Sequence, residues 1–179
     1  RSDFVQIATL FFALLVFVLL ATWPSGERAN NSWFILTQAR MVALAFLALA
    51  YGAGSSNKPR PEQRNTAFAL LVLVVLSLPL ELASYAASYP TTPMLWSFGL
   101  TLLDTLALFG IGLALGFLLT LIRLRGFISI AVIGALVGLF SIDQLLNFNL
   151  FNPLTTLHTV SPFHLGTMTV IAMLTLWQF

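Results

Sequence analysis

Long apolar stretches separated by short polar segments run through the whole chain. Six stretches are long enough to form helices that cross about 30 Å of hydrocarbon at about 1.5 Å per residue. They cover residues 4–23, 33–53, 66–89, 94–122 and 127–148, and a last stretch that ends at residue 179. The pattern predicts an all-α membrane protein, a bundle of six transmembrane helices that forms a single domain over residues 1–179.

The composition strengthens this interpretation. Apolar residues make up 59% of the 179 residues and charged residues only 8%, which excludes an ordinary soluble domain and a disordered chain. Six spans leave no room for a separate soluble domain. The absence of cysteine excludes disulfides, thiolate nucleophiles and Cys-ligated metals.

Positive charge is distributed unequally between the two predicted ends of the bundle. One end carries six cations and the other only Arg28. The six are Arg1, Lys58, Arg60, Arg64, Arg123 and Arg125. Because cytoplasmic loops accumulate Lys and Arg, the N-terminus and C-terminus are predicted to be cytoplasmic, in a plasma or inner membrane. Trp23, Trp33, Tyr89 and Trp96 then gather at the outer interface, which aromatic side chains prefer.

Two glycine pairs at four-residue spacing suggest where helices approach closely. Gly112 and Gly116 lie in the fourth span, and Gly134 and Gly138 lie at a comparable depth in the fifth. Small residues allow helix backbones to meet in lipid. We therefore expect a tight contact between these two spans.

Four ionisable residues lie inside apolar spans, one in each of spans two to five. They are Arg40, Glu81, Asp104 and Asp143. Their distances from the span ends place all four within ~7–15 Å of the outer boundary. Each costs at least ~2.5 kcal/mol at the bilayer centre, so these side chains should face the bundle interior or water and find partners there.

Uncharged polar residues continue the same pattern at helical spacing. They form stripes with Glu81 on the third span, with Asp104 on the fourth and with Asp143 on the fifth. This indicates a polar pocket in the outer half of the bundle. The predicted substrate-binding residues are Arg40, Glu81, Ser84, Tyr85, Thr101, Asp104, Asp143 and Gln144.

The charges of this predicted pocket do not balance. One arginine against three carboxylates leaves a formal charge of −2 if all are ionised. A slab of low dielectric constant disfavours that charge, so the pocket should hold protons or a cation. The alternative is a structural network in which Arg40 pairs with one carboxylate while the others form hydrogen bonds or face the outer interface.

His158 and His164 follow the fifth span, in an irregular segment with prolines. They could cap the pocket, sense pH or bind a metal with Asp143. Their six-residue spacing matches no metal motif, so interfacial histidines are the favoured interpretation, and no metal or cofactor is expected. Motifs of hydrolases, nucleotide-binding loops and dinucleotide folds are absent, which argues against an enzyme.

Together these features favour a membrane subunit of a transport system, which binds a small cationic or proton-coupled solute. In helix count and topology the prediction is similar to the substrate-binding subunits of energy-coupling-factor importers and to small permease subunits of ATP-binding-cassette systems. That similarity implies a separate ATPase or other membrane subunits, which would dock on two cationic segments: the loop at Lys58, Arg60 and Arg64, and the turn at Arg123 and Arg125. The basic loop is too small to indicate nucleic acid. The alternative is a membrane sensor region or an accessory subunit of a larger membrane complex.

Overall fold

A computed structural model describes residues 2–22, 32–88, 94–146 and 161–179, and these ranges are almost entirely helical with no strand. The helices are α1 (Ser2–Ala21), α2 (Ser32–Ser55), α3 (Arg60–Leu76), α4 (Leu78–Ala87), α5 (Met94–Leu121), the 3₁₀ turn η2 (Arg125–Phe127), α6 (Ile128–Leu146) and α8 (Pro162–Trp177). The predicted all-α fold is confirmed, with six helices when α3 and α4 count as one interrupted helix.

Four of these helical segments are long and apolar enough to cross a membrane. They are Phe4–Ala21, Trp33–Ser55, Arg60–Ala87 and Met94–Leu121. The apolar stretches of the last two helices, Arg125–Leu139 and Pro162–Trp177, are shorter within the described residues. The sequence pattern is thus supported by length and composition for the first four predicted spans.

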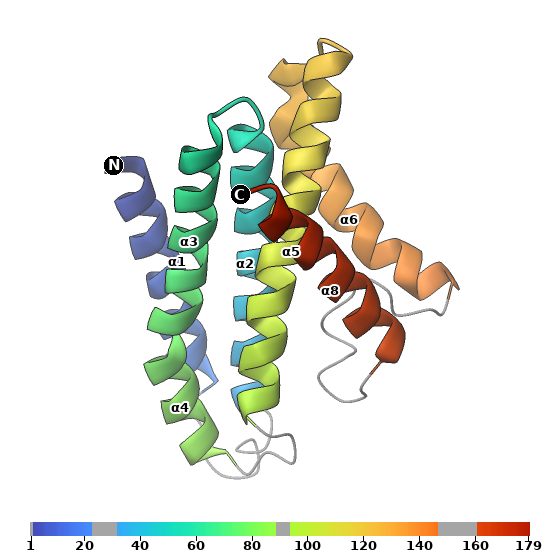
Figure 1. Cartoon of the computed structure of the whole chain (residues 1–179). Helices are drawn as coiled ribbons and strands as arrows, with labels where there is room; N and C mark the ends of the chain where they lie inside the picture. The colour runs from blue at the N-terminus through green and yellow to red at the C-terminus, as the bar shows by residue number, and fades with distance from the viewer. Residues whose placement is uncertain (1, 23–31, 89–93, 147–160) are drawn as a thin grey trace.

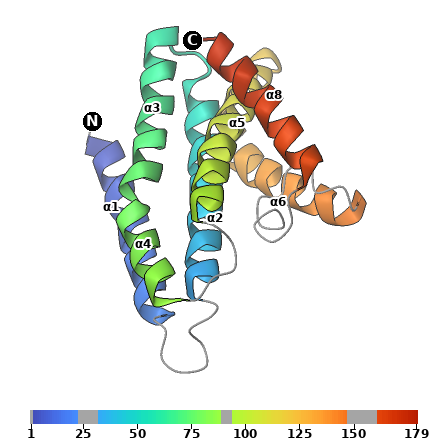
Figure 2. The same cartoon turned by 60° about the horizontal axis from the view of Figure 1, so that its bottom comes forward.

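Helices α1 to α5 run side by side, and α8 crosses α5 obliquely on the far side from α1 (Figures 1 and 2). Helix α1 begins, and α8 ends, toward the end of the bundle that holds the connection between α2 and α3 (Figure 1). The start of α1 and the end of α8 therefore lie toward the same end of the bundle (Figure 1).

Helix α2 is the centre of the packing, and its contact with α5 is the most extensive of any helix pair in the described residues. The two backbones touch because α5 presents glycines to α2. A Cβ on Gly112 would lie 2.5 Å from the carbonyl oxygen of Leu49, and one on Gly116 would lie 2.3 Å from that of Ala53. Such distances leave no space for any side chain, so these two positions require glycine.

The predicted contact between the glycine pairs of α5 and α6 is therefore wrong. A Cβ added at Gly134 or Gly138 would meet nothing within 4 Å. The depth of these glycines was a poor guide because the small face of α5 turns toward α2, which precedes it by two helices in the chain. Sequence adjacency does not fix which helices share a close contact.

The third predicted span begins earlier than expected and is interrupted. Helix α3 begins at Arg60, and the helix breaks at Ser77 before α4 resumes at Leu78. Pro79 explains the break, because its ring lacks an N–H group and collides with the carbonyl of the preceding turn. The Ser77 hydroxyl donates a hydrogen bond to the Val74 carbonyl at 2.7 Å, which satisfies one group at the break. The interruption places Glu81 in the first turn of α4.

Candidate functional site

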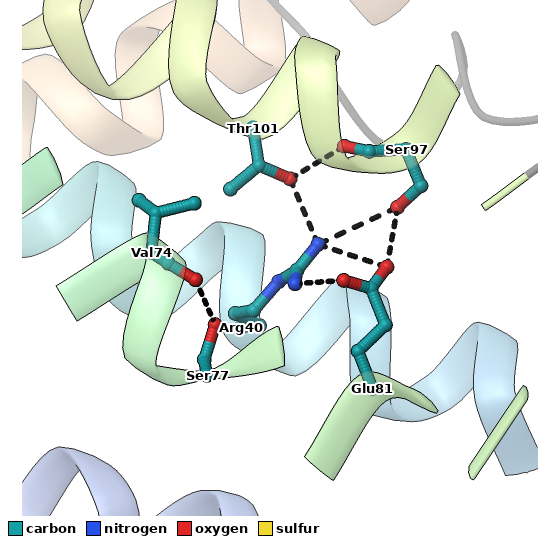
Figure 3. A network of polar contacts seen from close by, with 6 residues as sticks. All are labelled: Arg40, Val74, Ser77, Glu81, Ser97 and Thr101. Carbon is teal, nitrogen blue, oxygen red and sulfur yellow. Dashed lines mark hydrogen bonds and ion pairs between the residues drawn. The ribbon is translucent and has the colours of Figure 1, made fainter. Parts of the chain in front are cut away.

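Arg40 on α2 and Glu81 on α4 form a buried ion pair in the bundle interior (Figure 3). Their side chains are each about 2% exposed. Nη1 of Arg40 donates to Oε2 of Glu81, and Nη2 donates to Oε1 at 3.1 Å. This two-pronged arrangement is the strongest geometry that a guanidinium and a carboxylate can adopt.

Helix α5 closes this cluster with two hydroxyl groups (Figure 3). The Ser97 hydroxyl donates to Oε1 of Glu81 at 3.0 Å, and Nη2 of Arg40 donates to Oγ1 of Thr101 at 3.0 Å. Thr101 in turn donates to the Ser97 carbonyl at 2.8 Å. We call Arg40, Glu81, Ser97 and Thr101 the arginine cluster. Both oxygens of its carboxylate are paired.

The break between α3 and α4 positions Glu81 for this cluster. Glu81 is the acidic residue in the first turn of α4, and its backbone N–H donates to the Ser77 carbonyl at 3.2 Å across the break. The Pro79 break thus sets the start of α4, from which Glu81 reaches the guanidinium of Arg40.

A second buried pair joins Asp104 on α5 to His164 on α8. Nε2 of His164 lies 2.8 Å from Oδ1 of Asp104, and the two side chains are 0% and 6% exposed. The start of α8 fixes the imidazole: Ser161 caps the helix and its hydroxyl accepts a hydrogen bond from the His164 backbone N–H at 3.4 Å. We call Asp104 and His164 the histidine pair.

The favoured interpretation of His164 as an interfacial residue is wrong, because the side chain is fully buried. The reason is physical: a buried carboxylate at Asp104 requires a partner, and the oblique crossing of α8 over α5 brings the imidazole to it. His158 lies outside the described residues. Within the described part of the chain, no group of three or more His, Cys, Asp or Glu side chains could hold a metal ion.

The histidine pair leaves polar atoms without partners. Neither Oδ2 of Asp104 nor Nδ1 of His164 has a hydrogen-bond partner within the described residues. A void of about 10 Å³ lies beside Asp104, lined also by Thr101, Thr105 and Met41. That is about the space one water molecule needs. The small cavity that borders Arg40 and Glu81 has no room even for a water molecule.

The other predicted site residues lie in different surroundings. Ser84 is buried on α4, one turn from Glu81. Tyr85 packs edge-on against Trp33, with ring centroids 5.4 Å apart, and does not belong to the arginine cluster. Asp143 and Gln144 occur in α6, but their side chains lie outside the described residues. The structure therefore brings together Arg40, Glu81 and Thr101, and places Asp104 in the adjacent histidine pair.

Two residues of the site were missed or undervalued from sequence. Ser97 belongs to the polar stripe of the fourth span but was not selected as a site residue. His164 was excluded from the charge balance, although the excess of carboxylates was itself a signal that another basic group should lie nearby. The described part of the interior thus places one basic side chain beside each buried carboxylate, Arg40 beside Glu81 and His164 beside Asp104.

No known protein family, curated protein or solved structure matches the chain at a significant level. The functional argument therefore depends on the geometry of the two buried pairs.

Proposed function

We propose that this chain is a membrane-embedded subunit of a transport system, in which the histidine pair exchanges a proton for a small cationic solute. Four long apolar helices support a location in the bilayer, and the excess of cations at one predicted end supports cytoplasmic termini in a plasma or inner membrane. Ionisable side chains inside such a bundle are a functional hypothesis by default, because burying them is costly.

The observation that carries the proposal is the unsaturated carboxylate of Asp104. Its Oδ1 contacts His164, while Oδ2 has no hydrogen-bond partner in the described residues, and the small void lies beside this residue. When His164 is protonated, the pair is neutral. When the proton leaves, one net negative charge stays in a medium of low dielectric constant, and a positively charged solute would neutralise it. The negative charge of Asp104 is then balanced either by the proton on His164 or by a bound cation.

Entry of a solute requires movement, because about 10 Å³ beside Asp104 is too small for anything beyond a water molecule. Helix α8 is the element that would move. Its contact with α5 is less extensive than that of α2, and the residues buried there include the small Ala107 and Ala172 beside Met168. The arginine cluster, which borders no space for a ligand, would stay closed.

Proton release on cation binding tests this proposal directly. Lightly buffered protein in detergent is titrated with sodium, potassium or methylammonium chloride, with choline chloride as the control for ionic strength. We expect at least one of the three cations to release about one proton per chain from the wild type. Asp104→Asn should release at least tenfold less. Arg125→Gln, which removes an exposed charge far from the pair, should behave as the wild type.

His164→Gln tests which group of the pair holds the exchanged proton. The glutamine amide can still donate a hydrogen bond to Asp104 but cannot carry a proton, so Asp104 must itself take up a proton to become neutral in the apolar interior. We expect this variant to remain folded, as measured by its thermal unfolding, and to release a proton on cation binding, whereas Asp104→Asn with His164→Gln should release none. Release of a full proton from the double variant, or no release from the wild type with any of the three cations, would contradict the proposal.

A second candidate function is supported by the filled interior around Arg40. The arginine cluster pairs both carboxylate oxygens of Glu81 and borders no space for a ligand, as expected for a sensor region or an accessory subunit whose polar residues hold helices together. The transport subunit and the accessory subunit or sensor region differ in the proton release expected when cations are added. An accessory subunit would show the same stability losses in the variants but no cation-dependent proton release.

A further inference from the structure

A long apolar groove separates α1 from α3 on the outside of the bundle. Its volume is about 1030 Å³, and all but one of its lining residues are apolar, the exception being Thr9. Phe17 on α1 and Phe68 on α3 line it and are 70% and 68% exposed. Two large aromatic side chains are thus left uncovered by the other residues that the structure describes. The two helices diverge toward the end where α1 begins (Figures 1 and 2).

A cluster of cations lies at this wider end of the groove. Arg64 precedes the groove residue Phe68 by four positions, which is one helical turn on α3, and Arg60 lies one turn further. Both arginines and the neighbouring Lys58 are exposed, and Glu62 is the one carboxylate of this segment. Three cations against one carboxylate give the mouth of the groove a net positive charge.

We propose that the groove binds one acyl chain of an anionic phospholipid, with the lipid phosphate held by Arg60 and Arg64. The two parts of the surface match the two parts of such a lipid: the apolar groove takes the hydrocarbon chain, and the guanidinium groups can each form two hydrogen bonds with phosphate oxygens. This inference rests on the proposed membrane location and is independent of proton exchange.

The charge at its mouth favours a lipid over an additional helix as the occupant of the groove. The groove follows α1 from Phe4 to Leu20, a length of about 24 Å at ~1.5 Å per residue. A helix packed there would place apolar side chains or its own end against Arg60 and Arg64, whereas a lipid phosphate complements their charge.

Native mass spectrometry of the full chain in detergent tests the proposal, with phosphatidylglycerol and phosphatidylcholine of the same acyl chains as probes. We expect phosphatidylglycerol to bind at least tenfold more tightly than phosphatidylcholine. Replacing both arginines, Arg60→Gln with Arg64→Gln, should weaken phosphatidylglycerol binding by roughly 30-fold, because each cation near the surface contributes about a factor of five. The matched control, Arg123→Gln with Arg125→Gln, removes the same charge elsewhere and should change binding less than threefold.

Filling the groove tests the position of the chain. Ala13 lines the groove and Leu14 is exposed on another face of α1. Ala13→Trp should reduce phosphatidylglycerol binding at least tenfold, whereas Leu14→Trp should leave it unchanged. Equal binding of the two lipids, or no effect of Ala13→Trp, overturns the proposal. A dimer mass that Ala13→Trp abolishes would overturn it too, because the groove would then be an interface between two copies. Each of these results is independent of the proton-release titration, so the two proposals can fail separately.

Discussion

The two buried pairs along α5 hold charge in different ways. In the arginine cluster both oxygens of Glu81 are paired with donors, and Nε of Arg40 has no hydrogen-bond partner within the described residues. In the histidine pair Oδ1 of Asp104 contacts His164, while Oδ2 has no partner there, and a void of about 10 Å³ lies beside Asp104. The first pair leaves no carboxylate oxygen available, and the second leaves one.

The chemistry of the partners makes this difference larger. A guanidinium cannot lose its proton under ordinary conditions, so Arg40 must keep an anion beside it for as long as it is buried. An imidazole and a carboxylic acid can both change charge near neutral pH when their surroundings permit. The arginine cluster is therefore suited to holding α2, α4 and α5 together, and the histidine pair to gaining and losing a proton.

The largest expected effect comes from removing the anion of the arginine cluster. Glu81→Ala leaves the charge of Arg40 buried without its partner, and we expect a loss of about 3–5 kcal/mol in the free energy of unfolding. Thermal and denaturant unfolding in detergent micelles, followed by circular dichroism, measures this loss. His164→Gln should cost less, because an uncompensated Asp104 can take up a proton and become neutral.

The double variant Arg40→Met with Glu81→Leu is the matched control. It removes both charges and keeps similar volume, so we expect it to recover most of the stability that Glu81→Ala loses. A loss below about 1 kcal/mol for Glu81→Ala would mean that the pair is solvated or contributes little. The contrast between the arginine cluster and the histidine pair would then fail.

An intermediate effect is expected from the backbone contact between α2 and α5. In Gly112→Ala the new methyl group would lie 2.5 Å from the Leu49 carbonyl oxygen and 3.0 Å from its Cα, so α2 and α5 must separate. We expect a loss of about 1–3 kcal/mol, as for other overpacked sites. The measurement is the same unfolding transition in micelles.

Gly138→Ala on α6 is the control for this substitution. Its Cβ meets nothing within 4 Å, and alanine favours a helix over glycine by roughly 0.5–1 kcal/mol. We expect this variant to be unchanged or slightly more stable. Equal losses at Gly112 and Gly138 would instead indicate the contact between α5 and α6 that the glycine spacing first suggested.

The sequence was informative where a property depends on local pattern and depth. Apolar stretch length predicted the helices, and counting residues from the span ends predicted that Arg40 and Glu81 lie at one level. Equal depth matters because helices of similar length that pack side by side bring residues of equal depth close together. The Arg40–Glu81 pairing had been considered only as one form of the structural alternative.

Features that depend on helix neighbours were less accessible. The spacing of Gly112 and Gly116 indicates a close contact but not its partner, since that depends on how all the helices pack. His164 follows a proline-containing stretch of sequence in which no span end could be assigned, so its depth could not be counted. Pro79 does indicate the break in the third span, because proline in a helix interior removes a hydrogen bond. The prediction of one continuous span did not include this break.

The smallest effect distinguishes a hydroxyl that is part of the arginine cluster from one that is only near it. Ser97 donates to Oε1 of Glu81 at 3.0 Å, so Ser97→Ala should cost about 1–2 kcal/mol as a lost hydrogen bond to a charged group. Thr37 is also buried, one turn from Arg40, but its hydroxyl has no hydrogen-bond partner in the described part of the chain. Thr37→Val keeps the shape and removes an unpaired polar group, so stability should stay the same or rise. If unfolding in micelles gave equal losses for both, burial rather than pairing would set the contribution of each hydroxyl. The paired hydroxyl of Ser97 would then contribute no more to stability than the unpaired hydroxyl of Thr37.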